Sequence, residues 1–435
     1  MTTEAETRTE SGEGQSAPVQ APLGGARAWF VWSLSAMAFG YAFFHRVAPS
    51  VMVSDLMSEF AIGAALLGTL SALYFYPYVL LQVPLGALLD RLGARKLLFT
   101  ALSCATLGSV IFAMAPSLGW AYLGRILVGI GSAVGFLSSL SLAAQWFPQR
   151  RFAMLAGLTM FFGMMSGVLA QTPLALFVEQ FGWRASMWAL GGFGGLLAIM
   201  ILIFVRNSPH GNGRTVSENA ESWGDIWRGF SRAIKMAEVW KIAIVAAAMS
   251  GPMLALGGLW GTPYLMAAYD LTRPNAAFYV SFLFFAWAIG APASGWLSEH
   301  VGSYRTMLLA GAAILTVAVG MLTFLPSAPL WLTVVLLIVT GLSGSAMAVC
   351  FALVRQVSPT VISGSVSGIV NSMTVASGAL LQPVIGLALD MLWAGEIENG
   401  SRVYQAETYQ NAFILIFVVV LLGFIVGLRI KRVAQ

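Results

Sequence analysis

The sequence predicts an all-α membrane protein with twelve transmembrane helices in two bundles of six. Three observations support this fold class. First, 58% of the 435 residues are hydrophobic and only 9% are charged, whereas soluble proteins carry about 25% charged residues. Second, the chain contains a long series of apolar runs. Third, a short charged motif occurs twice, half a chain apart. A surface with so few charges is expected to face lipid.

Twelve apolar runs are each long enough, at about 18 residues or more, to cross a bilayer as a helix. A polar segment, 206–239, divides them into two groups of six, and within it Asn207-Ser-Pro209 is expected to stop a helix. The stretch 223–236 is amphipathic and is expected to lie on the membrane surface. The predicted spans are 28–52, 64–88, 97–115, 119–142, 153–178, 185–205, 240–266, 275–297, 306–325, 330–353, 363–391 and 409–429.

The predicted units follow from these runs. Residues 1–26 are polar and hold too little apolar surface to fold, so we expect a disordered tail. They also lack the basic region and short apolar core of a signal peptide. The remaining units are an N-terminal six-helix bundle (27–205), a central loop (206–239), a C-terminal six-helix bundle (240–430) and a short tail (431–435).

The repeated motif combines glycines with charges. A Gly is followed by an acidic residue at plus four, a second Gly at plus seven and a basic residue at plus ten. The glycines allow close helix packing and a sharp turn, and the acid can pair with a basic group or cap a helix. We interpret the motif as a latch on one side of the protein; ordinary loop charge is the alternative. Its residues are Gly86, Asp90, Arg91, Gly93, Arg95 and Lys96, and then Gly295, Glu299, Gly302 and Arg305.

The distribution of Lys and Arg predicts the orientation. With the N-terminus in the cytoplasm, about eighteen basic residues fall on the cytoplasmic side, and only Arg184, Arg273 and Arg402 fall on the other. Cytoplasmic loops are enriched in Lys and Arg. Both termini are therefore expected in the cytoplasm, with the protein in a bacterial-type inner (plasma) membrane.

Several classes of function find no support in the sequence. Cys104 and Cys350 are isolated within apolar runs, and no His or Cys cluster has metal-ligand spacing. No phosphate-binding loop is present, so we expect no cofactor, no metal and no enzyme activity. The net charge of +5 lies in loops, which argues against a nucleic-acid partner. A monomer in the lipid bilayer is expected, and a receptor role is disfavoured because no soluble domain is present.

Two arginines, Arg46 and Arg125, fall inside predicted helices. A charge at the centre of a bilayer costs about 2.5–3.5 kcal/mol on insertion scales, so such residues are usually functional and face a watery cavity. The guanidinium fork matches a carboxylate, which makes Arg46 the main candidate for binding an anion. The alternative for both residues is a structural contact with a backbone carbonyl or a neighbouring helix.

The first motif copy, read as G-x-x-x-D-x-x-G-x-R-K, resembles the signature of the major facilitator superfamily of secondary transporters. Arg125-Ile-Leu-Val-Gly129-Ile-Gly131 and Gly182-Trp183-Arg184 are similar to further features of that superfamily. The resemblance implies two six-helix bundles with inverted repeats and a substrate site between them near mid-membrane. It also implies alternating access by rocking of the bundles.

A narrower resemblance is to the anion:cation symporters of that superfamily. It is carried by Tyr41-Ala-Phe-Phe-His45-Arg46-Val-Ala-Pro-Ser50 and by the patterns of 68–86 and 364–386. This resemblance implies a small organic anion, a carboxylate or sugar acid, moved by proton symport. The alternatives are anion exchange, a proton-independent carrier, or export of a drug or siderophore-like solute. The predicted fifth helix lacks the G-P-x-x-G-G run that resembles drug:proton antiporters, which disfavours drug export.

Two positions depart from that branch. The acid that the branch carries in its first helix is His45 here, and the acid in its fourth helix falls at Ser132. No Asp or Glu lies deep within a predicted span, so His45 is the only deep group expected to change charge near neutral pH. The positive charge of Arg46 disfavours a protonated His45 until an anion binds. Our hypothesis is therefore proton coupling at His45, with Arg125; the alternative is that His45 is a hydrogen-bonded core residue.

The remaining candidates for substrate binding are polar or aromatic residues on helices that line the cavity in the resembling superfamily. For each aromatic residue the alternative is core packing or an interfacial belt. A buried amide needs a partner, and a substrate is one. These candidates are Tyr41, Tyr74, Tyr78, Gln82, Gln171, Trp260, Tyr264, Asn371 and Gln382.

Overall fold

A computed structural model describes residues 24–209, 223–325, 327–359, 363–398 and 400–431. Helices account for nearly all of these residues. In the described ranges the only strands are β1 (Ile397–Glu398) and β2 (Ser401–Arg402), which pair antiparallel as a small hairpin that the sequence patterns did not predict. Most of the predicted tail 1–26, part of the central loop and residues 432–435 lie outside the described residues.

The N-terminal half contains the helices up to Phe204. They are α1 (Ala26–Val47), η1 (Ala48–Val51), α2 (Val53–Phe60), α3 (Ala64–Ala72), α4 (Phe75–Ala113), α5 (Leu118–Ser132), α6 (Gly135–Trp146), η2 (Gln149–Arg151), α7 (Phe152–Leu169) and α8 (Thr172–Phe204). The central segment carries α9 (Trp223–Ala233).

The C-terminal half contains a second series of helices, in which η3 is a π-helix. They are α10 (Ala237–Pro252), η3 (Met253–Trp260), α11 (Gly261–Tyr269), α12 (Arg273–Val301), α13 (Tyr304–Phe324), α14 (Leu330–Gly344), η4 (Ser345–Ala348), α15 (Val349–Gln356), α16 (Ser363–Met391) and α17 (Ala406–Leu428).

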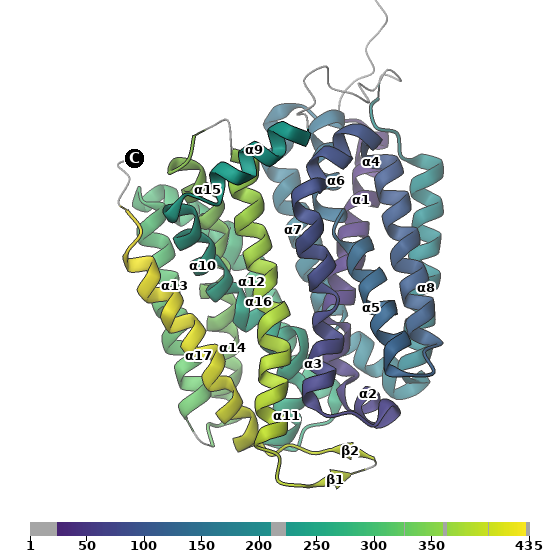
Figure 1. The fold of residues 1–435 in the computed structure, drawn as a ribbon, viewed down its shortest axis with the longest axis vertical. Coiled ribbons are helices and arrows are strands. Elements are labelled where there is room, and N and C mark those ends of the chain that lie inside the picture. The colour runs from purple at the N-terminus through teal and green to yellow at the C-terminus, as the bar shows by residue number, and fades with distance from the viewer. Residues whose placement is uncertain (1–23, 210–222, 326, 360–362, 399, 432–435) are drawn as a thin grey trace, which may run out of the picture.

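These helices make twelve membrane crossings. Ten segments of the described chain are long and apolar enough to span a membrane, and one of them, Gln149–Phe204, is 56 residues long. A sharp break at Gly182, with φ 82°, divides that segment into two crossings. Helix α1, continued by η1, supplies the twelfth. The predicted fold of two six-helix bundles is confirmed (Figure 1).

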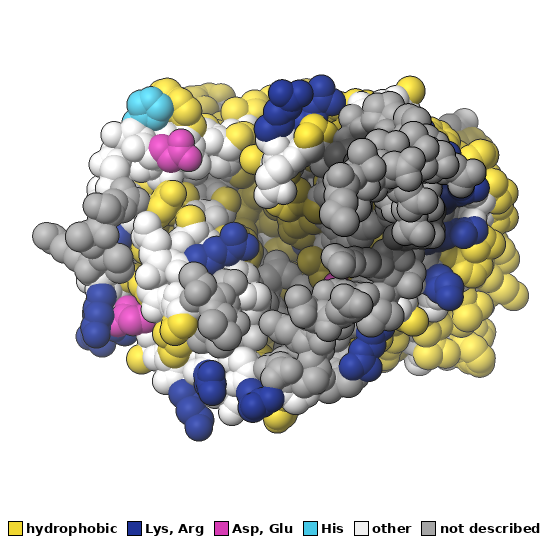
Figure 2. Space-filling model, turned by 90° about the horizontal axis from the view of Figure 1, so that it is seen from above, with side chains coloured by type: hydrophobic (Ala, Val, Ile, Leu, Met, Phe, Trp, Pro, Cys, Tyr) yellow, Lys and Arg dark blue, Asp and Glu magenta, His cyan; other side chains and the backbone are white. Residues whose placement is uncertain are grey.

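The two ends of the bundle differ in charge. We call the end that carries Arg91, Arg95, Lys96 and helix α9 the basic end, and the end that carries α2 and the β1–β2 hairpin the hairpin end. Figure 2 views the basic end and shows Lys and Arg side chains spread around its rim, with few acidic side chains in view. This asymmetry agrees with the distribution that the sequence predicted.

The repeated motif forms a tight helical turn in each half. Gly93 has φ 73° and Gly302 has φ 66°, a left-handed conformation that favours glycine. Gly86 and Gly295 have nothing within 4 Å of an added Cβ atom. The second glycine of each copy therefore makes the expected turn, whereas the first does not mediate close helix packing in this conformation.

The halves pack most closely toward the hairpin end. One hydrophobic cluster joins both halves and includes Val51, Leu56 and Leu67 with Leu256 and Ile385. A second cluster lies within the N-terminal half alone and is formed by segments near the basic end, such as 85–105 and 142–155. Buried apolar surface therefore continues across the two halves mainly on the hairpin side.

Candidate functional site

Arg46 lies at the end of α1 and is almost fully buried, with 7% of its surface exposed. Four aromatic rings surround its guanidinium, with centroids 4.8 Å away for Phe43, 5.7 Å for Tyr74, 5.8 Å for Phe75 and 5.2 Å for Tyr78. Cation–π attraction is worth about 0.5–2 kcal/mol per contact, most when desolvated. The rings therefore offset part of the cost of burying the charge.

The guanidinium of Arg46 is not fully satisfied. Its Nε is buried and has no hydrogen-bond partner in the described structure. The hydroxyl groups of Tyr74 and Tyr78 interact with the guanidinium, and no described carboxylate forms an ion pair with it. A buried cation without an anionic partner is unusual. The position is therefore suited to binding an anion from outside the chain.

A polar contact between the two halves lies beside this arginine. Asn371 on α16 donates to Gln82 on α4 at 2.9 Å, and the Tyr78 hydroxyl interacts with both Arg46 and Asn371. The Nε2 of Gln82 is buried and has no hydrogen-bond partner among the described residues. The structure thus brings together Arg46, Tyr74, Tyr78, Gln82 and Asn371, all predicted from the sequence, at the boundary between the halves.

Arg125 on α5 is also buried but has different contacts. Its guanidinium donates to the carbonyl of His45 at 2.9 Å and to the carbonyl of Ser71 at 3.2 Å. These bonds join α5 to α1 and α3. The contacts are those of the structural tether that the sequence left open as an alternative.

His45 points into the N-terminal bundle. It is 1% exposed, and its Nε2 lies 3.2 Å from the Ser109 hydroxyl. The Tyr41 hydroxyl lies 3.3 Å from the same oxygen, so the three side chains form a buried polar chain between α1 and α4. Ser132, where the resembling branch carries an acid, is 2% exposed and its hydroxyl has no partner in the described structure.

The other four predicted binding residues lie away from Arg46. Gln171 donates to the carbonyl of Gly257 at 2.9 Å and accepts from Thr262 at 3.1 Å, which joins the halves. Trp260 donates to the carbonyl of Gln382 at 3.1 Å, and Gln382 donates to Leu254 at 2.8 Å. Tyr264 packs against Tyr409 and Phe413 inside the C-terminal half. In this conformation all four hold helices together.

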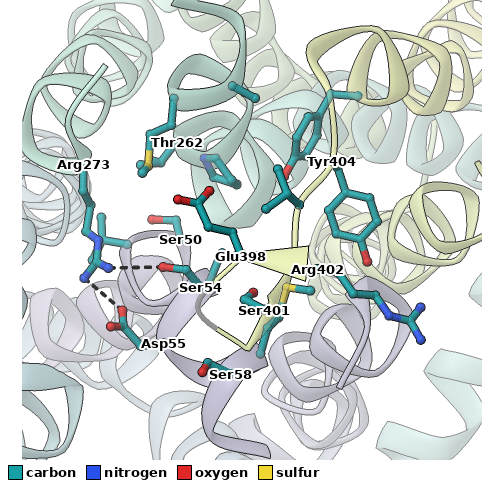
Figure 3. Close-up of a pocket in the computed structure, with 18 of the residues that line it drawn as sticks. Ser50, Ser54, Asp55, Ser58, Thr262, Arg273, Glu398, Ser401, Arg402 and Tyr404 are labelled. Atoms are coloured by element: carbon teal, nitrogen blue, oxygen red, sulfur yellow. Dashed lines mark hydrogen bonds and ion pairs between the residues drawn. The ribbon is translucent and has the colours of Figure 1, made fainter. Parts of the chain in front are cut away.

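A cavity of about 1020 Å³ opens at the hairpin end. Its lining includes Ser50 and Thr262, both contacts of Gln171, and Figure 3 shows Arg273 pointing to Ser54 and Asp55 across it. The ion pair between Arg273 and Asp55 is 2.9 Å long and joins the two halves. None of the residues around Arg46 lines this cavity. It is a vestibule, and the Gln171 contacts lie at its inner wall.

One basic residue of each motif copy binds the last helical segment of its own half. Arg95 donates to the carbonyl of Leu202 at the end of α8, and Arg305 donates to Leu428 and Ile430 at the end of α17. Asp90 is exposed and forms no hydrogen bond or ion pair with another described residue. The expected latch is therefore not engaged in this conformation.

Sequence reasoning missed some of the contacts of the site. Phe43 and Phe75 complete the ring of aromatic side chains, and Ser109 joins His45 to Tyr41. Phe43 lies three residues before Arg46, a spacing that places two side chains on one helix face. That spacing could have identified Phe43 as a neighbour of Arg46 from the sequence. Ser109 and Phe75 lie on other helices and could be assigned only from the folded structure.

Comparison with known proteins gives relatives that are transporters. The chain is 29% identical over 39% of its length to an uncharacterized transporter of Bacillus subtilis, YybO, and this match also covers 39% of that relative. It is 22% identical to a probable sulfoacetate transporter of Cupriavidus necator, covering 65% of this chain and 68% of the relative. It is 24% identical to a probable L-galactonate transporter of Escherichia coli, covering 79% of each chain.

Other relatives differ in their named substrates. A multidrug resistance protein of Mycobacterium tuberculosis, Stp, is 24% identical and is matched over 80% of this chain and 73% of its own length. Among solved structures, a bacterial homologue of the human lysosomal transporter Spinster, in an inward-facing and occupied conformation, has a TM-score of 0.75. That structure is 16% identical and covers 93% of this chain, with 97% of its own chain matched, which supports the fold alone.

The family itself follows from a match to most of the chain. Residues 33–383 match the sequence profile of the Major Facilitator Superfamily. The twelve crossings and the pair of six-helix bundles agree with that match. The chain therefore belongs to the Major Facilitator Superfamily, whose members are membrane transporters and not enzymes.

Proposed function

We propose that the protein moves a small organic anion, a carboxylate, sulfonate or sugar acid, across the membrane by alternating access. The observation that carries this proposal is the buried Arg46, whose guanidinium has neither a backbone carbonyl nor a carboxylate as an acceptor among the described residues, although its Nε is buried. A charge-assisted, two-pronged hydrogen bond between Arg and an anion is roughly twice as strong as a neutral one. A bound anion would supply the charged hydrogen-bond acceptors for the Arg46 guanidinium that the surrounding aromatic rings cannot supply.

The neighbours of Arg46 suggest how binding is linked to movement. Gln82 and Asn371 come from opposite halves and meet next to Tyr78. A ligand held by Arg46 can exchange hydrogen bonds with this amide pair, and its distal polar groups then contact both halves. A ligand that contacts both halves shifts the balance between two conformations only if its contacts differ in the two conformations.

The structure supports a conformation closed at the hairpin end. Three polar contacts join the halves at this end or near the middle of the membrane: a hydrogen bond of Gln171, a hydrogen bond of Asn371 and the ion pair of Arg273. In Figure 2 the surface between the halves is recessed at the basic end. We place the basic end in the cytoplasm of a bacterial cell, following the positive-inside rule.

Proton symport through His45 is the coupling that we propose. His45 follows Tyr41 by one helical turn, adjoins Arg46 in sequence, and has a polar chain through Ser109. Arg125 holds the carbonyl of His45 and so positions this segment. An anion bound at Arg46 lowers the local positive potential and favours a proton on His45. Anion exchange and proton-independent transport are the alternatives.

Export of a cationic drug is less well supported, although one relative is a multidrug resistance protein. A site for a cation needs a buried acid or a free aromatic cage. In the described site the aromatic rings already surround Arg46, and every charge that they enclose is positive.

The test is uptake into proteoliposomes that contain the purified protein. Sulfoacetate and L-galactonate serve as radiolabelled probes, within a wider panel of organic acids. We expect Arg46→Ala to abolish uptake of any anion that the wild-type protein carries, and Arg184→Gln, at an exposed ion pair of the hairpin end, to retain it. Wild-type rates in Arg46→Ala would contradict the binding role. Uptake of a lipophilic cation in place of every anion would contradict the substrate class.

The coupling test uses the same vesicles with an imposed pH gradient. We expect an inwardly directed proton gradient to stimulate uptake in the wild-type protein. His45→Gln can keep a hydrogen bond to Ser109 but cannot change its charge, so this variant should lose the stimulation. Stimulation that persists in His45→Gln would show that the proton is carried elsewhere. No stimulation in the wild-type protein would favour exchange or a proton-independent carrier.

A further inference from the structure

A carboxylate of one half binds the start of a helix in the other half at the hairpin end. Asp390, near the end of α16, accepts from the backbone N–H of Ala64 at 3.0 Å and from that of Ala65 at 2.9 Å. These are the first two residues of α3. The first N–H groups of a helix have no partner within it and carry a partial positive charge, so an acid there is stabilising.

Two side chains of the C-terminal half hold this carboxylate in place. Arg402 on β2 donates to Asp390 at 3.1 Å, and the Tyr404 hydroxyl donates to the same carboxylate at 2.5 Å. The Ala64 N–H also donates to the Tyr404 hydroxyl at 3.1 Å. Burial, followed by the hydrogen bond to Asp390, raises the pKa of Tyr404 above its ordinary value, so the hydroxyl remains a proton donor at neutral pH.

The fit between the two halves is close at this point. A Cβ atom added to Gly63 would lie 2.5 Å from both carboxylate oxygens of Asp390. Gly63 has φ −85°, which any residue can adopt. The lack of a side chain at position 63 therefore serves the contact with Asp390 and is not required by the backbone.

We infer that Asp390 is a lock that holds the hairpin end closed by capping the first turn of α3 across the boundary between the halves. The lock rests on the proposed alternating access. When the halves separate, Asp390 keeps Arg402 and Tyr404, which belong to its own half, so its charge remains compensated. Only the N–H groups of α3 lose a partner, and water can replace it. Breaking this one contact therefore costs little, as a reversible switch requires.

The helical segment that begins with α3 carries its own acid, Asp90 on α4, at the opposite, basic end of the molecule. Asp90 follows the first residue of α3 by 26 positions, and Asp390 follows the first residue of α16 by 27. Asp90 is exposed and unpaired among the described residues, whereas Asp390 is engaged. The Asp390 contact thus belongs to the conformation in which the motif at Asp90 is released.

The test measures distances across both ends of the full-length protein in lipid nanodiscs, without any solute. Spin labels at Ser117→Cys and Ala394→Cys report the hairpin end, and labels at Gln149→Cys and Gln356→Cys report the basic end; all four positions are exposed. The background carries Cys104→Ala and Cys350→Ala. Pulsed electron paramagnetic resonance gives the population of each distance.

We expect Asp390→Ala to raise the ratio of open to closed hairpin ends by about 2- to 30-fold, the range that loss of a helix N-cap produces. The basic-end pair should shift to shorter distances in the same variant. Gly63→Ala should act in the same direction because its methyl group collides with the carboxylate. In the Asp390→Ala background, Gly63→Ala should add nothing further.

Glu59→Gln is the matched control, because it removes an acid of the hairpin end whose ion pair, with Arg184, stays within the N-terminal half. It should leave both distance distributions unchanged. Wild-type distributions in Asp390→Ala and Gly63→Ala, or fully additive effects of the two, would overturn the lock. If Asp390→Ala does not fold, Gly63→Ala decides the question, because it displaces the carboxylate and leaves Asp390 in the chain. Because no solute is present, failure of anion binding would not affect this result.

Discussion

Arg46 and Arg125 are both buried arginines of the N-terminal half, but their surroundings differ. The guanidinium of Arg125 donates to two backbone carbonyls and joins three helices. The guanidinium of Arg46 lies among four aromatic rings beside a pair of amides that joins the halves. Both arginines keep a buried Nε without a hydrogen-bond partner among the described residues, but only Arg125 donates to backbone carbonyls; no described carbonyl or carboxylate accepts from Arg46.

The comparison shows that burial of a charge does not by itself identify a functional residue. The acceptors around the guanidinium distinguish the two roles, because carbonyl partners stabilise the folded state whereas missing partners favour a ligand. Each role predicts a different response to mutation.

The largest expected effect is on stability at Arg125. Arg125→Ala removes two hydrogen bonds from a charged group, each worth about 1.5–3 kcal/mol, and takes a donor away from two buried carbonyls. We expect the free energy of unfolding to fall by about 3–5 kcal/mol, as measured by denaturation in mixed detergent micelles. Arg46→Ala should cost less than half of that, because it removes a charge that the chain only partly compensates. Equal losses in the two variants would remove the distinction.

The next largest effect is expected when Arg46 is replaced by another positively charged side chain that lacks the planar guanidinium group. Arg46→Lys keeps the positive charge but cannot form a two-pronged bond to an anion. We expect the apparent KM for anion uptake to rise by roughly 10-fold or more, since one charge-assisted hydrogen bond is lost. Arg125→Lys should leave the KM within about 2-fold and reduce stability instead. A changed KM in Arg125→Lys alone would reverse the two assignments.

A smaller effect separates the two tyrosines beside Arg46. Both hydroxyl groups interact with Arg46, but that of Tyr78 also interacts with Asn371, whereas that of Tyr74 donates its proton to the carbonyl of Ala42 at 2.8 Å. Tyr78→Phe should raise the KM by about 3- to 10-fold, and Tyr74→Phe should lower stability by about 1 kcal/mol with little change in KM. Uptake kinetics and unfolding curves of the two variants provide the check.

The smallest effect is expected at the amide pair. A neutral hydrogen bond such as Gln82–Asn371 contributes about 0.5–1.5 kcal/mol. A double-mutant cycle with Gln82→Ala and Asn371→Ala should give a coupling energy in that range for the protein without ligand. Saturating anion should change the coupling if the ligand replaces the amide contact. An unchanged coupling would place the anion elsewhere along the boundary.

Much of the fold was predictable because lipid imposes strong rules on a sequence. Apolar runs long enough to cross the bilayer predicted the twelve crossings, and the repeated motif predicted the turns at Gly93 and Gly302. The β1–β2 hairpin and helix α2 were not predicted, since such short elements leave no periodic signal. The exact starts of helices also differed, as for α10, which begins at Ala237.

The candidate site was predictable only in part. A charge inside an apolar run identified Arg46 and Arg125, and the amides pointed to Gln82, Gln171, Asn371 and Gln382. Which of them meet depends on helix rotation. Gln82 and Asn371 turn toward each other beside Tyr78, while Gln171 and Gln382 bond to backbone carbonyls of the segment 254–257.

The amino-acid sequence alone was enough to establish a membrane-embedded helical fold, its two halves and the charge asymmetry of its ends. These properties depend on hydrophobicity and on the order of residues along one helix. The separate roles of Arg46 and Arg125, and the contact of Asp390 with α3, emerged only from the folded chain. Each is a contact between segments distant in sequence, and such contacts are decided by how the helices pack.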